Sequence, residues 1–544
     1  MSRTPLLRSL TKRLRDLRIA RATGAPLDEL PELRDEARRR RAQAGPPLSR
    51  RAILGGALAG GALLSLPGSA RAASHQSKSV TIVGGGISGL NCALSLRDTG
   101  VTSTVYEASG RIGGRMFSNT SYWAANQVSE WCGELIDTGH KTIRRLAARY
   151  NLALDDLLAA EPTGSKETYK FDGAYYRKSD ADADFLAMAD FLAQDLADAG
   201  YPTTYDAYTP EGYELDHTSV YDWIESRVPG GHASNLGLLL DVAYNIEYGA
   251  DTRVQSSLNL IYLLGYQPTA KHLDVFGASD ERFHIRGGNQ RLPEAIAADL
   301  GSQVVTGHKL VRIVETPNGR YTCTFTRGNG TVDVTSDLLV LAIPFAVLAD
   351  VDYHRAGFDA LKHTAITELG RGRNGKLQLQ FDSRVWNAGG AWPGTANGSS
   401  YADTGYQASW DVTRAQAGTQ GILVMYSGGN ATEAMKTLSP FATASDPRVV
   451  QDAQRGLPQL KQVYPGLAWN NRATQSLPHK SNLFNASYSY WRLGQYTQFA
   501  GYEGQKQGGV YFCGEHTSQD FQGFMEGGAL TGEVTAKKVA RAAI

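Results

Sequence analysis

Residues 79–107 read SVTIVGGGISGLNCALSLRDTGVTSTVYE and give the clearest indication of the fold. The apolar run Ser79–Val83 predicts a short buried strand, and Leu90–Asp98 predicts a helix. Ser103–Tyr106 predicts a second strand, which ends at Glu107. A strand, a glycine-rich turn, a helix and a further strand in this order are typical of a βαβ unit with parallel strands.

The glycine spacing in the turn predicts a dinucleotide site. Gly84 permits the tight turn, Gly86 lets the backbone approach a pyrophosphate, and Gly89 allows the helix to pack closely on the strand. Ile87 and Ser88 begin the helix, where unpaired N–H groups can bind phosphates. The carboxylate at the end of the second strand can accept hydrogen bonds from ribose hydroxyls. The alternative is a glycine-rich turn that binds no ligand.

The remaining chain mixes further helices and strands. Helices are expected over Lys141–Tyr150, Ala183–Ala199, Ser234–Tyr244 and Gly528–Ala543. Strands are expected over Arg320–Thr326, Val332–Thr335, Val340–Pro344 and Val510–Cys513. This mixture predicts the α/β class, and 544 residues are enough for two domains.

The first 72 residues predict an export signal. They hold 15 Lys/Arg and 6 Asp/Glu, with paired arginines at Arg50 and Arg51. The apolar run Ala52–Leu66 and the small-residue site Ala70–Ala72 follow, as in signals of the twin-arginine route. The run is shorter than the ~20 residues that span a bilayer. We therefore expect a periplasmic or secreted protein, exported by the twin-arginine machinery, with no permanent membrane span. An uncleaved anchor or a basic helix is the alternative.

The rest of the chain is acidic. Residues 73–544 hold 40 basic and 48 acidic residues, a net charge of −8, which argues against nucleic acid as the main partner. The four cysteines form no C-x-x-C pair, so no metal site is expected. Buried free thiols are expected in preference to disulfides.

The segment after the second strand extends the dinucleotide site. Glu107–Arg115 reads EASGRIGGR. It resembles the signature E-A-S-x-R-x-G-G-R of the flavin-containing amine oxidase superfamily, which includes monoamine, polyamine and L-amino acid oxidases. The resemblance implies that this segment wraps the pyrophosphate of FAD and the edge of its ring, through Ala108, Arg111, Gly114 and Arg115. Two arginines beside glycines would also suit phosphate on chemical grounds.

Further motifs extend the resemblance along most of the chain after residue 73. Gly133 and Glu134 resemble the family's G-G-E segment near the flavin, and Gly287–Leu292 resembles its G-G-x-x-x-L turn. Val311 matches a position whose backbone contacts the adenine.

Two motifs near the C-terminus complete the resemblance. Gly514 and Glu515 resemble a closing G-E motif, in which the carboxylate binds the ribityl or pyrophosphate part. Gly523, Phe524 and Met525 begin a turn beside the flavin, and the N–H of Met525 is implied to contact the pyrimidine edge.

The resemblance also implies a domain organisation. A Rossmann-like FAD-binding domain of the glutathione-reductase and amine-oxidase type is joined to a mixed-sheet, α+β substrate-binding domain. The FAD-binding domain is discontinuous, with segments 73–140, 283–344 and 480–544, and the substrate-binding domain takes 141–282 and 345–479. FAD is expected to bind non-covalently, because Ala486 stands near the position of the monoamine oxidase attachment cysteine.

Lys376 is the predicted catalytic lysine. Within Asn374–Phe381, alternation places Lys376, Gln378 and Gln380 on one face of a strand. The resemblance implies that Lys376 holds a water near flavin N5. An ordinary edge-strand lysine is the alternative.

Trp410, Gly523 and Phe524 complete the predicted catalytic set. The Gly523 carbonyl can accept a hydrogen bond from the substrate ammonium. Phe524 replaces one tyrosine of the monoamine oxidase aromatic cage, and Ser487 is expected near the position of the other. Three further pocket candidates are equally well explained by packing: Asp411, Tyr488 and Trp491.

The predicted function is FAD-dependent oxidative deamination of L-amino acids to 2-oxo acids, with ammonia and hydrogen peroxide as the other products. Gly133–Asp137, Tyr488–Tyr496 and Gly514–Phe524 look most like bacterial and cyanobacterial-type L-amino acid oxidases. Several of those favour basic amino acids, so the resemblance implies basic amino acids as the candidate preference. The alternatives are an oxidase of monoamines or polyamines, a flavin desaturase or monooxygenase, and a non-enzymatic FAD-binding protein. Relatives are often dimers, so a homodimer is a candidate state.

An oxidase of L-amino acids needs a residue that binds the substrate carboxylate. A bidentate arginine is the usual anchor, and snake-venom-type L-amino acid oxidases carry one in a G-P-M-R segment. This chain has Gly133–Ile136 there, without an arginine. Arg371 and Arg492 are the candidate replacements. Candidates for selecting a cationic side chain are Asp411, Asp520 and Glu526.

Overall fold

The computed structural model of the chain describes residues 78–269 and 272–543. The export signal predicted over residues 1–72 lies outside them, so the export interpretation stays a prediction. Within the described ranges, no helix is both long enough and apolar enough to cross a membrane.

Five parallel strands form the sheet that carries the glycine-rich turn, in the order β23-β13-β1-β2-β9. Their bounds are β1 Val80–Val83, β2 Thr104–Tyr106, β9 Val304–Val305, β13 Leu338–Leu341 and β23 Val510–Phe512. The parallel register brings the carboxyl ends of β1 and β2 to one edge, where the Gly84 N–H donates to the Tyr106 carbonyl at 2.8 Å. The turn and Glu107 therefore lie side by side at this edge.

Two helices pack closely beside this sheet. Helix α3 (Ile87–Asp98) follows the turn, and α15 (Met525–Ala543) ends the described chain. A Cβ at Gly532 would lie 2.3 Å from the Ser88 carbonyl oxygen, so a side chain there would keep the helices apart. The Asn91 side chain donates to the Ala529 carbonyl at 2.7 Å. This packing fixes the turn before α15 beside the glycine-rich turn.

A separate four-stranded sheet has the strand order β12-β11-β10-β14. Its bounds are β10 Lys309–Glu315, β11 Tyr321–Arg327, β12 Gly330–Ser336 and β14 Asp352–Arg355. The remaining elements near the parallel sheet are α4 Lys141–Arg149, α10 Arg291–Leu300, α11 Phe345–Leu348 and α12 Ala360–Glu368, and α14 Gln495–Phe499 contacts α12. Three two-stranded pairs complete this part: β3 Ser118–Asn119 with β4 Ser129–Glu130, β5 Leu154–Asp156 with β8 Phe283–Ile285, and β15 Gly370–Arg371 with β22 Ser489–Tyr490.

The second large sheet has eight strands in mixed orientation, in the order β20-β21-β16-β19-β18-β17-β6-β7. Their bounds are β6 Lys166–Phe171, β7 Ala174–Tyr176, β16 Asn374–Phe381, β17 Ala396–Ala402, β18 Ala408–Asp411, β19 Gly421–Gly428, β20 Phe441–Thr443 and β21 Trp469–Ser476. Strand β16 pairs with β19 on one side and β21 on the other. The edge-strand interpretation of Lys376 is therefore wrong.

The two faces of β16 are both covered. Leu377, Leu379 and Phe381 share a hydrophobic core with α13 (Pro447–Val463). Lys376 and the two glutamines alternate to the other face and are also buried, which confirms the predicted alternation.

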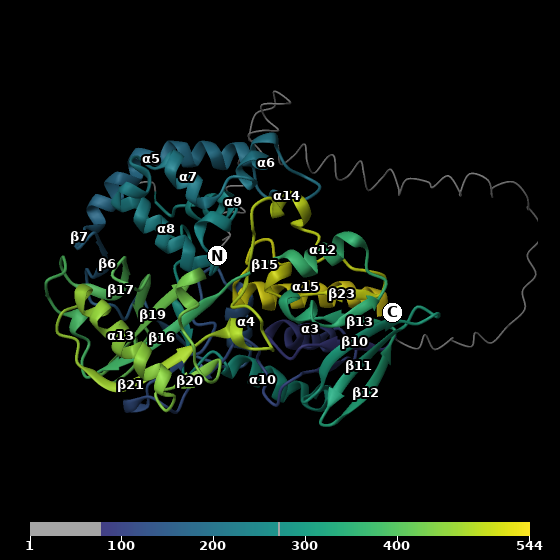
Figure 1. The fold of residues 1–544 in the computed structure, drawn as a ribbon. Coiled ribbons are helices and arrows are strands. Elements are labelled where there is room, and N and C mark those ends of the chain that lie inside the picture. The colour runs from purple at the N-terminus through teal and green to yellow at the C-terminus, as the bar shows by residue number, and fades with distance from the viewer. Residues whose placement is uncertain (1–77, 270–271, 544) are drawn as a thin grey trace, which may run out of the picture. The chain divides into compact units, whose positions relative to one another are not determined.

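Helices cover part of the eight-stranded sheet (Figure 1). They are α5 Lys178–Ala199, α6 Pro210–Asp216, α7 Val220–Arg227, α8 Asn235–Tyr248 and α9 Ser257–Leu264. Large aromatic side chains that are almost fully buried, including Trp223 and Tyr244, fill the core beneath them. The structure confirms the predicted α/β class with a mixed second sheet, whereas the domain boundaries stay predictions.

All four cysteines are free thiols, as predicted. Cys92, Cys323 and Cys513 are buried, and Cys132 is half-buried.

Candidate functional site

One cavity of about 660 Å³ is lined by residues of the parallel sheet and of the eight-stranded sheet, a volume typical of cofactor and small-molecule sites. Nearly all the predicted site residues line it: Gly84, Gly86, Ile87, Ser88, Glu107, Ala108, Arg111, Gly114, Arg115, Gly133, Glu134, Val311, Lys376, Trp410, Gly514, Glu515, Gly523, Phe524 and Met525. Gly89 does not line the cavity. A Cβ at Gly89 would lie 2.0 Å from the Gly84 carbonyl oxygen, so this glycine serves helix packing.

The glycines of the turn have different physical roles. Gly84 has φ +108° and its Cβ would lie 2.8 Å from the Ala342 carbonyl oxygen, so the turn itself requires glycine. Gly86 has φ −76° and ψ 175°, which any residue adopts, and its Cβ would meet only the Gly114 Cα at 3.9 Å. No contact within the protein explains a glycine at position 86. A ligand that approaches the backbone at the start of α3 does explain it.

Glu107 fastens the loop that follows β2. Its Oε2 accepts from the Gly85 N–H at 2.8 Å, and its Oε1 accepts from the N–H and hydroxyl of Ser109 at 2.9 and 2.8 Å. The carboxylate lines the cavity beside Ala108 and Val311. It is placed to accept hydroxyl donors from a ligand, and the predicted ribose contact stays a prediction.

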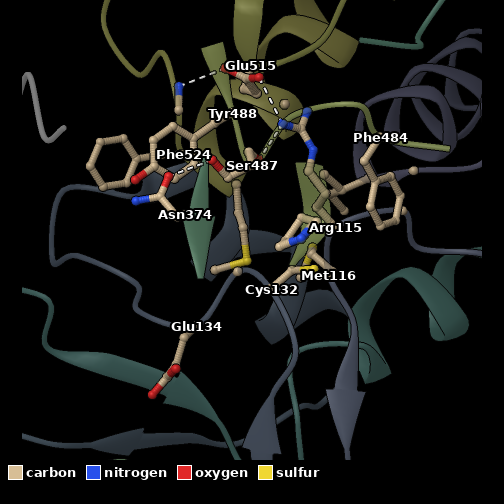
Figure 2. A pocket seen from close by; sticks show the side chains of 18 of the residues that line it. Arg115, Met116, Cys132, Glu134, Asn374, Phe484, Ser487, Tyr488, Glu515 and Phe524 are labelled. Atoms are coloured by element: carbon tan, nitrogen blue, oxygen red, sulfur yellow. Dashed lines mark hydrogen bonds and ion pairs between the residues drawn. The ribbon is translucent and has the colours of Figure 1, made fainter. Parts of the chain in front are cut away.

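The two arginines of the signature make different contacts. Arg111 closes its own loop, because its guanidinium donates to the carbonyls of Ile112 and Gly114 at 2.9 and 2.6 Å. Arg115 reaches across the site instead (Figure 2). Its Nη1 donates to the Ser487 carbonyl at 2.9 Å and to Glu515 Oε1 at 3.0 Å.

Glu515 joins three segments that are distant in sequence. Besides Arg115, its carboxylate accepts from the Ser489 hydroxyl at 2.7 Å and from the Gly523 N–H at 2.9 Å. Burial alone would raise the pKa of Glu515, but Arg115 and these donors outweigh burial and lower it. The ionised carboxylate therefore holds the 523–525 turn in place, and its predicted contact with FAD stays a prediction.

The cavity also carries polar and thiol groups that bear on a cofactor. His516 is buried, and neither ring nitrogen has a partner among the described residues; burial lowers its pKa to about 4. Burial raises the pKa of the Cys132 thiol to about 11, which keeps it protonated and unreactive. The helix start, the open glycine and the unsatisfied imidazole therefore fit FAD held without a covalent bond.

Lys376, Glu134 and Trp410 form one bonded group on the cavity wall. Lys376 Nζ lies 2.6 Å from Glu134 Oε2 and donates to the Cys132 carbonyl at 2.7 Å. Trp410 Nε1 donates to Glu134 Oε1 at 2.8 Å. Only 7% of each of the Lys376 and Glu134 residues is exposed, so the charges are shielded from water. Sequence analysis grouped Glu134 with the cofactor ligands, whereas the structure shows it bonded to the predicted catalytic lysine.

An aromatic wall lies beside this group. Gly523 has Tyr488 as its nearest neighbour, with the Tyr488 ring 3.7 Å from a Cβ placed there. Tyr488, Phe524 and Tyr426 all line the cavity, and the hydroxyls of Tyr488 and Tyr426 lie 3.2 Å apart. Ser487, predicted at the second cage position, donates to Asn374 Oδ1 at 2.5 Å (Figure 2). The aromatic neighbour of Gly523 is therefore Tyr488, one residue further along.

Several weaker predictions are wrong, because the residues do not line the cavity: Arg371, Asp411, Trp491, Arg492, Asp520 and Glu526. Arg371 and Arg492 are exposed. Asp411 accepts from Trp386 Nε1 at 3.1 Å, and Glu526 accepts from backbone N–H groups at the start of α4. These carboxylates stabilise local structure.

Further charged residues line the cavity that no sequence motif predicts. Arg414 follows β18, and its Nη1 donates to Glu161 Oε1 at 2.7 Å. The unpredicted carboxylates are Glu161, Glu167, Glu247, Asp274, Asp280, Glu281 and Asp350. They come from separate segments and share no motif, so no local pattern could have grouped them. The described part of the chain contains no cluster of side chains suited to a metal ion.

The fold and the sequence both have known relatives. A cyclohexylamine oxidase from Brevibacterium oxydans shares the fold with a TM-score of 0.70 at 19% identity, over 86% of this chain and 99% of that one. Polyamine oxidase 1 of Zea mays is 22% identical over 83% of this chain and 88% of its own length. An L-amino-acid oxidase of Sistrurus catenatus edwardsii is 23% identical over 86% of this chain and 88% of its own.

The family profile described as flavin containing amine oxidoreductase matches residues 87–540. This match runs from the start of α3 almost to the end of α15 and includes all the residues that line the cavity except Val83, Gly84 and Gly86. The chain therefore belongs to the flavin-containing amine oxidoreductases and is a flavin-dependent enzyme that acts on amines.

Proposed function

We propose that the chain is an FAD-dependent oxidase of L-amino acids, with a preference for basic ones, that releases a 2-oxo acid, ammonia and hydrogen peroxide. When bound, the flavin would accept hydride from the substrate carbon next to the amine nitrogen and pass the two electrons to oxygen, which leaves as hydrogen peroxide, while water hydrolyses the resulting imine to the 2-oxo acid and ammonia. The protein has to orient the substrate, bind its charges and exclude water.

The observation that carries the proposal is Arg414 on the cavity wall. Its side chain is 8% exposed, Nη1 binds Glu161, and Nε donates to the Asp411 carbonyl at 3.2 Å. Nη2 has no hydrogen-bond partner among the described residues, so it is available to a substrate carboxylate. Apart from Arg111 and Arg115, Arg414 is the only arginine of the described chain that lines the cavity.

Acidic residues on the same walls support a basic substrate. Glu167, Asp274, Asp280 and Glu281 line the cavity and form no ion pair with a lysine or arginine of the described residues. Glu281 adopts a left-handed backbone with φ 43°, held by a hydrogen bond from its N–H to the Asp137 carboxylate at 2.9 Å. A cationic side chain would offset the mutual repulsion of these carboxylates.

A second candidate is an oxidase of diamines or polyamines that lack a carboxylate. The salt bridge between Arg414 and Glu161 favours it, because a paired guanidinium offers less to an anionic group. The maize relative is named as a polyamine oxidase and the bacterial structure as a cyclohexylamine oxidase. Both candidates place a cation among the carboxylates, and they differ in the need for Arg414.

A set of four matched substrates separates the candidates. L-lysine carries the carboxylate and the second ammonium. Cadaverine lacks the carboxylate, L-norleucine lacks the second ammonium, and pentylamine lacks both. Peroxide formation with each, compared as kcat/KM, measures the two requirements independently. We expect kcat/KM for L-lysine to exceed that for cadaverine or L-norleucine, each of which lacks one charged group, by about 10- to 100-fold. This is the range of a charge-assisted hydrogen bond. Peroxide from cadaverine but not from L-lysine would contradict the proposal.

Variants of Arg414 test whether this residue binds the substrate carboxylate. Arg414→Met is expected to lower kcat/KM for L-lysine about 10- to 100-fold without the same loss for cadaverine, and Arg414→Lys should recover part of it. Arg448→Met is the matched control, because Arg448 is exposed on α13 and does not line the cavity. The flavin content of each variant shows whether the fold is intact. Equal losses on both substrates would contradict the anchoring role.

Export and assembly are proposals of their own. We propose that residues 1–72 direct twin-arginine export to the periplasm or medium and are then removed. The mass of the protein recovered outside the cytoplasm tests this, and a chain that retains Met1 would contradict removal. We also propose a homodimer, which light scattering of the purified enzyme would test.

A further inference from the structure

The two oxygens of the Glu134 carboxylate contact two different side chains. Glu134 Oε2 lies 2.6 Å from Lys376 Nζ, and Glu134 Oε1 accepts from Trp410 Nε1 at 2.8 Å. Glu134 and Lys376 are buried, and all three side chains line the cavity. Lys376 has one further acceptor, the Cys132 carbonyl at 2.7 Å.

The remaining contacts connect this group to the aromatic wall. The Trp410 ring lies 5.1 Å from the Tyr426 ring in an edge-on arrangement. The Tyr426 hydroxyl lies 3.2 Å from that of Tyr488, which also donates to the Ile246 carbonyl at 3.0 Å. Lys376 Nζ lies 5.7 Å from the centre of the Trp410 ring. A displacement of the Glu134 carboxylate would therefore release both the ammonium and the indole from their present positions.

We propose that Glu134 is a positioning residue that fixes Lys376 for the reaction with oxygen and Trp410 for the substrate wall. Oxygen takes up two electrons and two protons and leaves as hydrogen peroxide, so negative charge develops on it during the reaction. An ammonium held in place stabilises that charge without reorganising. The inference rests on the flavin chemistry of the proposed function, but not on which amine is oxidised.

Glutamine at position 134 breaks this arrangement selectively. A carboxylate offers two acceptor oxygens, whereas an amide offers one acceptor and a donor group. Glu134→Gln can therefore accept from Lys376 or from Trp410, but not from both. The other donor then faces the amide NH2 in a nearly dry site, which is unfavourable. The substitution keeps the size of the side chain but removes its double acceptance and its negative charge.

The test measures reoxidation of flavin that was reduced with dithionite, so no amine substrate is involved. Rapid mixing with oxygen is followed at the flavin absorbance for the wild type, Glu134→Gln, Lys376→Met and the double variant. We expect Glu134→Gln to slow reoxidation about 10- to 100-fold, as misplaced catalytic groups do. In the Lys376→Met background, Glu134→Gln should cause no further slowing, because its effect passes through the lysine.

A second readout does not depend on turnover. The reduction potential of the bound flavin should fall in Lys376→Met, which removes a positive charge from the cavity, and rise in Glu134→Gln, which removes a negative one. If Glu134 and Lys376 only supported the fold, their variants would not shift the potential in opposite directions. Glu214→Gln is the matched control, since Glu214 is exposed on α6 and does not line the cavity.

Three results would overturn the inference. One is wild-type reoxidation in Glu134→Gln with full flavin content, and another is a double variant that is slower than Lys376→Met alone. The third is a potential that moves in the same direction in both single variants. Dithionite reduces the flavin in this test without any amine. A negative result for Glu134 is therefore independent of whether L-amino acids are the substrates.

Discussion

Replacing Gly86 by alanine should separate the ligand's requirement for glycine from that of the fold. The Cβ would meet only the Gly114 Cα at 3.9 Å, and the backbone at φ −76° and ψ 175° accepts any residue. Gly86 precedes the first turn of α3, so alanine costs the apoprotein only about 0.5–1 kcal/mol as a poorer N-cap. The same methyl group stands where a phosphate would approach the N–H groups of the helix.

The expected loss of FAD affinity is much larger than the loss of stability. A hydrogen bond between an N–H and a charged phosphate contributes about 1.5–3 kcal/mol. Loss of one such bond raises the Kd for FAD about 10- to 100-fold. The apoprotein is titrated with FAD and quenching of flavin fluorescence gives Kd, while urea unfolding of the apoprotein gives the change in stability.

Two other glycines supply controls: substitution of one is expected to destabilise the fold, and substitution of the other is expected to change nothing. A Cβ at Gly89 would lie 2.0 Å from the Gly84 carbonyl oxygen, so Gly89→Ala should destabilise the apoprotein by about 1–3 kcal/mol or more. Gly110 is exposed with no atom within 4 Å of its Cβ, so Gly110→Ala should change neither quantity. FAD binding by Gly86→Ala with the wild-type Kd would refute the reasoning, and so would an apoprotein as unstable as Gly89→Ala.

Three further results are expected. Glu515→Ala leaves Arg115 without its carboxylate partner and frees the Gly523 N–H, so FAD affinity should fall at least about 10-fold; an unchanged Kd in the same titration would contradict this. Trp410→Phe removes the indole donor to Glu134 and should raise KM for the best substrate more than it lowers kcat, which steady-state peroxide assays at varied substrate would show. Burial, reinforced by neighbouring carboxylates, raises the pKa of Glu281 to about 8. The residue is therefore protonated at low pH, and KM for L-arginine, which stays cationic throughout, should fall as pH rises from about 6.5 to 8.5; a KM that is flat over this range would contradict a role for Glu281.

The parts of the site that sequence predicts are those encoded in short local patterns. The βαβ unit is predictable because strand, turn and helix each have a local signal, and the parallel register then places Glu107 beside Gly84. The alternation of β16 likewise predicts that Lys376 shares a face with two glutamines, since side chains alternate along any strand.

The parts that sequence does not predict depend on tertiary contacts. Arg414 and Glu281 lie in loops without a motif, and only the packing of the two large sheets brings them to one cavity. The salt bridge between Glu134 and Lys376 joins residues that no local pattern connects. The sequence predicts Ser487 at the second cage position, whereas the structure places Tyr488 beside Gly523, because loop lengths between motifs are not fixed by local preferences.

Anaerobic reduction of the bound flavin by candidate substrates tests the proposed substrate class without the oxygen reaction. The purified, oxygen-free enzyme is mixed with L-lysine, L-arginine, cadaverine or benzylamine, and the visible absorbance of the flavin is followed. We predict rapid and complete bleaching by the two basic L-amino acids and slower bleaching by cadaverine. A flavin that stays oxidised with both amino acids but is bleached by cadaverine or benzylamine would contradict this prediction.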